Sequence, residues 1–301
     1  MKNVIDFFKK KNRTKNIVAL ITPMKKNGCL DYFGIDNVIK YQISNKIDGI
    51  LVAGTTGEAS TLKEEEYVKL LEIVLEHSCG KIPVFFGIHS NSTTGCIEII
   101  KKVKNYPISA FLTVVPYYNL PNQEGIYKHF MKISEFSNIP QIIYNVPKRT
   151  GSKILTRTIY KLSKFGNIIG IKECSKKYRI YKNLKRKKFL FFSGNDSTFI
   201  DFIKNGGNGV ISTLSNAIPD KISKICSLLD NKEYKKVNLL KKEINSLFFA
   251  ISLETNPIVI KYICKSLRII KNSFVRLPLT ELNKKNKKIV KNIIKKYKKI
   301  T

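Results

Sequence analysis

The chain has 301 residues, 43% of them hydrophobic, which suffices for one large hydrophobic core or two ordinary domains. It has 55 Lys and Arg against 22 Asp and Glu, a formal net charge of +33. The basic residues are spread along the whole chain, which argues against a nucleic-acid partner. No apolar segment reaches the roughly 18–20 residues of a membrane span, so we expect no membrane partner either.

Residues 1–15 form a basic N-terminal extension without the apolar run and cleavage site of a secretory signal. The six cysteines include no C-x-x-C pair, so we expect free, reduced thiols in a cytoplasmic protein. His77, His89 and His129 lie at no metal-ligand spacing from one another, and we expect no metal site.

Eight short apolar runs, rich in β-branched and aromatic residues, predict strands. Their starts lie 20 to 35 residues apart, too far for hairpins. The runs are almost continuously apolar rather than alternating, which is typical of parallel strands covered on the outside. They are residues 16–22, 48–54, 83–88, 110–116, 141–147, 168–174, 189–194 and 209–215.

Helical patterns fill the intervals between these runs. Residues 61–78 show helical spacing of apolar residues, with Thr61 and Glu64 suited to a capping box. Residues 122–137 show the same spacing, and residues 197–207 end in glycines that suit a C-terminal cap.

This alternation of strand and helix predicts a (β/α)8 TIM barrel over residues 16–216. Residues 217–301 contain helical patterns but no further strand run, so we expect the final barrel helix and a small helical C-terminal extension. The tail 281–301 carries nine lysines, yet its apolar residues recur at helical spacing, which predicts an amphipathic helix with a solvated lysine face.

In such a barrel the carboxyl ends of the strands surround the active site. Lys172 stands alone in the apolar run "IIGIKECS" and alternation directs it into the barrel mouth. Burial favours the neutral amine, which is the form that attacks ketones to give Schiff bases. The alternative is a structural lysine that lines the barrel, with its charged end either reaching solvent or held in an ion pair.

Two further strand ends offer groups that suit a small polar substrate. In "GTTGE" (54–58), the hydroxyls of Thr55 and Thr56 with nearby backbone N–H groups suit a carboxylate. Tyr144 lies near the end of the fifth predicted strand, next to the strand that carries Lys172, and is placed for proton transfer. Arg149, in the loop that follows, can bind a second carboxylate. The alternative for Tyr144 is a role in core packing only. The alternative for Arg149 is a surface position without a function.

With these residues assembled, the chain resembles the dihydrodipicolinate synthase family of pyruvate-dependent class I aldolase-type lyases. The resemblance runs from about Ile17 to "RLPLT" at 276–280. The motifs that carry it are "GTTGE", "PYYNLPNQEG", "YNVPKRTG", "GIKE", "SGND", "GGNGVIS" and "NPIVIKY".

The resemblance implies condensation of pyruvate with L-aspartate 4-semialdehyde to 4-hydroxy-tetrahydrodipicolinate, the first committed step of diaminopimelate and lysine biosynthesis. It implies no cofactor, because the lysine imine is itself the electron sink. It also implies a homo-oligomer, typically a dimer of dimers, in which each subunit lends Tyr118 to its neighbour's site.

The resemblance also assigns roles to individual residues. Lys172 is the Schiff-base lysine, and Tyr144, Thr55 and Tyr118 form the proton relay. The other positions bind substrate: Thr56 holds the pyruvate carboxylate, the Ile211 backbone contacts the pyruvate adduct, Arg149 receives the carboxylate of the aldehyde, and the Gly194 backbone lies nearby.

One departure concerns feedback inhibition by lysine. Many members place a glutamate and a histidine or similar residue where this chain has Gly95 and Tyr67, although Asn91 and Tyr117 remain. Without that glutamate carboxylate, the ammonium group of a bound lysine has no ion-pair partner. We therefore expect weak inhibition by lysine or none.

Two rival hypotheses remain. N-acetylneuraminate lyase and keto-deoxy sugar acid aldolases resemble the chain in the lysine, the tyrosine and the threonine-rich turn, but they generally lack the arginine found here as Arg149. A basic barrel retained as a scaffold or nucleic-acid binder would show decay of the matched residues, and every one of them is present.

Overall fold

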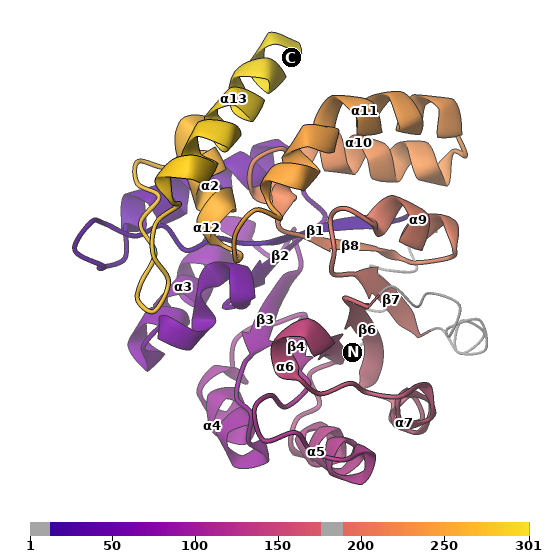
Figure 1. Cartoon of the computed structure of the whole chain (residues 1–301). Coiled ribbons are helices and arrows are strands. Elements are labelled where there is room, and N and C mark those ends of the chain that lie inside the picture. The colour runs from indigo at the N-terminus through magenta and orange to yellow at the C-terminus, as the bar shows by residue number, and fades with distance from the viewer. Residues whose placement is uncertain (1–12, 176–188, 301) are drawn as a thin grey trace.

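The computed structural model describes residues 13–175 and 189–300. Eight parallel strands close into a barrel in chain order, with β8 pairing back to β1, so the predicted (β/α)8 barrel is confirmed (Figure 1). The strands are β1 (Lys15–Ala19), β2 (Gly49–Val52), β3 (Val84–Ile88), β4 (Ala110–Val114), β5 (Gln141–Asn145), β6 (Ile168–Glu173), β7 (Leu190–Ser193) and β8 (Gly209–Ser212).

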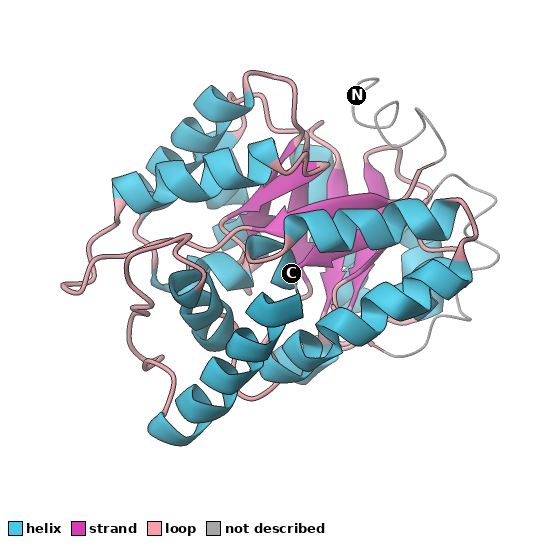
Figure 2. Ribbon diagram, turned by 90° about the horizontal axis from the view of Figure 1, so that it is seen from above, coloured by secondary structure: helices cyan, strands magenta, loops and turns pink. Residues whose placement is uncertain are grey.

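The helices surround the strands on the outside (Figure 2). Short 3-10 turns follow β2 and β8: η1 (Thr55–Gly57), η2 (Ala59–Thr61) and η4 (Leu214–Asn216). The helices are α2 (Tyr32–Ser44), α3 (Glu64–Ser78), α4 (Thr93–Val103), α5 (Gln123–Phe136), α6 (Pro147–Thr150), α7 (Thr156–Leu162), α9 (Phe199–Lys204), α10 (Pro219–Asp230), α11 (Tyr234–Ala250), α12 (Ile258–Ser266) and α13 (Lys284–Ile300).

Strand side chains are buried on both faces, which explains the continuous apolar runs. One set, including Ile17, Leu51, Phe85 and Ile142, fills the barrel interior, while the alternating set packs under the helices. Each strand lies within its predicted run, except that β1 begins one residue earlier, at Lys15. Residues 1–12 of the predicted basic extension lie outside the described residues.

The predicted capping box at Thr61 is wrong. Thr61 ends η2 and its hydroxyl donates to the Glu58 carbonyl, because the turn after β2 continues further than expected. Helix α3 instead begins after Lys63, whose backbone N–H donates to the Glu66 carboxylate at 2.9 Å.

The glycine cap predicted after α9 is confirmed. Gly206 has φ +100°, and its N–H donates to the Ile203 carbonyl, while the Gly207 N–H donates to the Phe202 carbonyl. This bonding pattern is the Schellman motif, which needs a left-handed residue after the helix.

The C-terminal segment contains helices and no strand in its described part, as predicted, with turns and irregular structure at residues 251–257 and 267–283. Helix α13, yellow in Figure 1, packs against α11 and α12 and buries Val290, Ile294 and Tyr297. Its lysines lie on the opposite, solvated face. None of the described helices combines the length and the apolar character needed to cross a membrane. All six cysteines are free thiols.

Candidate functional site

Lys172 lies on the inner face of β6 with 6% of its surface exposed. The register of the sheet sets it beside Tyr144 of β5, and its Nζ atom lies 4.4 Å from the centre of the Tyr144 ring. Burial lowers the pKa of Lys172, and the nearby Cys174 and Asp196 oppose this only in part. Among the described residues, no carboxylate forms an ion pair with Lys172. The site therefore favours a neutral, nucleophilic amine.

Two cavities meet at Lys172. One, of about 170 Å³, has mainly apolar walls formed by the barrel interior. The other, of about 260 Å³, has walls of mixed polar and apolar character, formed largely by the loops after β7 and β8 and by the C-terminal segment. A reactant bound in either cavity would therefore lie against the lysine. Both cavities are lined by Thr55, Tyr144, Val146, Arg149 and Lys172.

Thr55 and Thr56 form the η1 turn at the end of β2. The Thr55 side chain lies within hydrogen-bonding reach of the Tyr144 hydroxyl, and burial raises the pKa of Tyr144 well above its ordinary value. Tyr144 thus stays protonated at neutral pH and can donate a proton. The hydroxyl of Thr56 accepts a hydrogen bond from Nδ2 of Asn256 at 2.9 Å.

Gly194 gives the lysine its space. A Cβ atom at this position would lie 2.3 Å from Sγ of Cys174 and 3.0 Å from Cε of Lys172, far inside van der Waals contact. Any side chain here would displace the lysine or the thiol. This steric reason for a glycine at the end of β7 was not visible in the sequence.

Arg149 and Ile211 occupy different surroundings. Arg149 lies in the short helix α6, exposed to solvent, yet it lines both cavities and donates to the Asn256 carbonyl at 3.4 Å. Ile211 is buried in the barrel interior on β8, and it is not one of the described residues that line the two cavities.

Tyr118 lies outside both cavities of its own chain. It is 89% exposed and has φ +73°, a conformation that non-glycine residues rarely adopt. Leu120, two residues on, is also exposed and has a positive φ. The structure therefore brings together every predicted site residue of the barrel mouth except Tyr118 and Ile211.

Asp196 and Asn256 are among the further polar residues that line the second cavity, and neither was predicted as a site residue. Asp196 is buried, and its carboxylate accepts hydrogen bonds from the Ser212 hydroxyl and from the Thr213 backbone at 3.0 Å. Burial raises its pKa, and these hydrogen bonds oppose the rise. Asn256 reaches the site from beyond the barrel. The motifs "SGND" and "NPIVIKY" contained both residues, and the first lies at a predicted strand end, but neither Asp196 nor Asn256 was singled out as a site residue.

The residues expected around a lysine effector lie beside the barrel mouth. Nδ2 of Asn91 donates to the Tyr117 carbonyl at 3.3 Å, and the Tyr117 hydroxyl donates to the His89 carbonyl at 3.1 Å. The Tyr67 ring lies 6.2 Å from that of His89. Gly95 lies in the first turn of α4 and supplies no side chain to this group.

Comparison with known proteins agrees with this geometry. The model of the dihydrodipicolinate synthetase family matches residues 12–297. A 4-hydroxy-tetrahydrodipicolinate synthase of Buchnera aphidicola subsp. Cinara cedri (strain Cc) is 44% identical over 282 residues, covering 93% of this chain and 95% of the relative.

Two solved structures are also similar. The dihydrodipicolinate synthase from Acinetobacter baumannii complexed with pyruvate has a TM-score of 0.91 at 33% identity, covering 95% of this chain and 99% of that one. The enzyme from Cyanidioschyzon merolae with lysine bound has a TM-score of 0.90 at 32% identity, covering 97% and 99%. With a family model matched over nearly its whole length, this chain belongs to the dihydrodipicolinate synthetase family.

Proposed function

We propose that the protein condenses pyruvate with L-aspartate 4-semialdehyde to 4-hydroxy-tetrahydrodipicolinate through a Schiff base on Lys172. The observation that carries this proposal is the buried lysine of lowered pKa beside Tyr144, at the junction of two cavities. The names of the relatives and the pyruvate complex of one of them support the same reaction.

In the first half of the reaction, the neutral Nζ of Lys172 attacks the ketone carbon of pyruvate. Loss of water from the adduct gives an iminium, and loss of a methyl proton gives an enamine. Tyr144, kept protonated by burial and next to Thr55, donates and accepts these protons. Thr56 and the backbone of its turn hold the pyruvate carboxylate, and the Ile211 backbone contacts the adduct.

In the second half, the enamine carbon attacks the aldehyde carbon of the semialdehyde. Arg149 receives the carboxylate of that substrate in the second cavity, near the Gly194 backbone. Oδ1 of Asn256 is buried there without a hydrogen-bond partner in the described part of the chain, which suits the substrate ammonium. The amino group of the condensed product displaces Lys172 from the imine and closes the ring.

We further propose a cytoplasmic homo-oligomer, a dimer of dimers, in which Tyr118 completes the proton relay of the adjacent subunit. Its exposure and positive φ support this role. Strained backbone conformations cluster at functional sites, and an exposed side chain can contact a neighbouring subunit.

The test is turnover of the purified enzyme with pyruvate and the semialdehyde, measured by coupling the product to its reductase. We expect turnover that needs both substrates and is lost in Arg149→Met. Faster cleavage of a keto-deoxy sugar acid or of N-acetylneuraminate than condensation would refute the proposal and assign the chain to the sugar-acid branch of aldolases.

A further inference from the structure

The turn that carries Thr55 and Thr56 ends in a strained residue. Glu58 is not glycine, yet it has φ +57° in the left-handed region. Such residues persist only where the surrounding structure holds them. The contacts of Glu58 therefore decide the geometry of the turn.

Those contacts come from the C-terminal extension. Nζ of Lys261 on α12 lies 2.5 Å from Oε1 of Glu58, and both side chains are fully buried. The same ammonium donates to the Phe274 carbonyl at 2.7 Å, and the Arg276 backbone N–H donates to Oε2 of Glu58 at 2.9 Å. Burial lowers the pKa of Lys261, and the Glu58 carboxylate opposes this.

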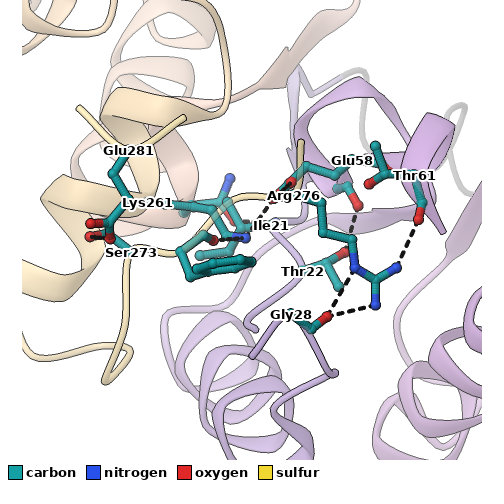
Figure 3. A network of polar contacts seen from close by, with 12 residues as sticks. Ile21, Thr22, Gly28, Glu58, Thr61, Lys261, Ser273, Arg276 and Glu281 are labelled. Atoms are coloured by element: carbon teal, nitrogen blue, oxygen red, sulfur yellow. Dashed lines mark hydrogen bonds and ion pairs between the residues drawn. The ribbon is translucent and has the colours of Figure 1, made fainter. Parts of the chain in front are cut away.

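The Arg276 side chain fastens the same segment to the barrel loops. Its guanidinium pairs with Glu66 and donates to the Gly28 carbonyl at 2.7 Å and the Thr61 carbonyl at 2.7 Å. Figure 3 shows the Arg276 guanidinium directed at Gly28 and Thr61, with Glu58 above it. Glu58, at the end of η1, and Thr61, at the end of η2, are thus both held by Arg276, which lies more than 200 positions away in the chain.

Asn256, at the start of this segment, touches the site itself. Its Nδ2 donates to the Thr56 hydroxyl at 2.9 Å, and its carbonyl accepts from Arg149. The segment therefore reaches the turn twice, once at the hydroxyl of Thr56 and once through the carboxylate of Glu58.

We propose that residues 256–276 position the pyruvate-carboxylate turn, with Asn256 acting directly on Thr56 and Lys261 acting through Glu58. Lys261 and Asn256 are positioning residues in this account, which rests on the proposed function. Replacing Lys261 by a neutral residue leaves the Glu58 carboxylate buried without its ion-pair partner. The strained turn then relaxes away from the geometry that binds pyruvate.

The experiment measures trapping of pyruvate by borohydride as a function of pyruvate concentration, without the second substrate. The variants are Lys261→Met, the double variant Lys261→Met with Glu58→Gln, and Asn256→Ala. Lys265→Met is the matched control, because it makes the same change on an exposed position of the same helix. Circular dichroism and unfolding temperature report the fold of each variant.

A positioning role predicts that the half-saturating pyruvate concentration rises at least about fivefold in the Lys261 and Asn256 variants, while Lys172 remains fully trapped at saturation. Lys265→Met should match the wild type. A merely structural role would lower the trapped fraction without moving the half-saturation point. The double variant removes both buried charges and keeps the test valid if Lys261→Met fails to fold.

Folded variants with wild-type half-saturation would overturn this inference alone, and so would an equal effect of Lys265→Met. If neither Lys261 variant folds, Asn256→Ala decides, because it leaves the buried pair intact. Absence of any adduct in the wild type would overturn the proposed function instead.

Discussion

Substitution of Gly194 by alanine tests the geometry of the reactive lysine. The added methyl would lie 2.3 Å from Sγ of Cys174 and 3.0 Å from Cε of Lys172. Ordinary carbon contacts are about 3.5–4.0 Å, so the thiol must move by more than about 1 Å, whereas the direct contact with the lysine asks for only a few tenths of an ångström. We expect the displaced thiol to push the neighbouring amine further, and a total displacement of about 1 Å costs on the order of 100-fold in rate. The overpacking also lowers the free energy of unfolding by about 1–3 kcal/mol.

A second substitution separates the two neighbours. Cys174→Ala removes the closer contact, and the remaining one at 3.0 Å needs a shift of only a few tenths of an ångström. We expect Gly194→Ala to lose about 100-fold in kcat/KM for pyruvate and the Cys174→Ala double variant to stay within about tenfold of Cys174→Ala alone. Gly166→Ala is the control, because nothing lies within 4 Å of its added methyl. Wild-type kinetics in Gly194→Ala, or no recovery in the double variant, would refute the steric argument.

Four further predictions follow from the same site. Because burial lowers the pKa of Lys172, pyruvate trapping should rise with pH and level off below the ordinary lysine pKa of 10.5, and a midpoint at that value would contradict the burial argument. A lowered lysine pKa costs stability, fully below the lowered pKa and progressively less as pH rises toward the ordinary value of 10.5, so Lys172→Met should abolish turnover and raise the unfolding temperature at neutral pH; a lower temperature would contradict this. Tyr118→Phe should slow turnover but not trapping, and mixing it with Lys172→Ala in equal amounts should restore about a quarter of wild-type activity, since half of the dimers then contain one complete site; no recovery would exclude a relay across subunits. Lysine should inhibit weakly or not at all because Gly95 offers no carboxylate, and a sub-millimolar inhibition constant in initial-rate assays would contradict this.

The strands were predictable because burial on both faces leaves an apolar signal in every one of them. Lys172 was predictable for the related reason that one charge in such a run is costly unless it serves a purpose. Lys261 is likewise a single lysine in an apolar run, "NPIVIKY". In the structure it has no reactive role but forms a buried ion pair with Glu58. Local sequence cannot separate these two cases, because the carboxylate that decides between them is 203 positions away.

Other features depend on contacts that no local pattern encodes. Thr61 looked like a helix cap, but the turn after β2 runs on into a second 3-10 turn that uses its hydroxyl. Asp196 and Asn256 line the cavity only because the loop after β7 and the segment before α12 fold over the same strand ends. Such residues become visible once the topology is known.

The most direct test of the account is to incubate the protein with pyruvate, reduce with borohydride and map the adduct by peptide mass spectrometry. The account predicts one reduced pyruvyl adduct, on Lys172, formed by the neutral amine that burial favours. A folded protein that gives no adduct, or an adduct on another lysine, would contradict it.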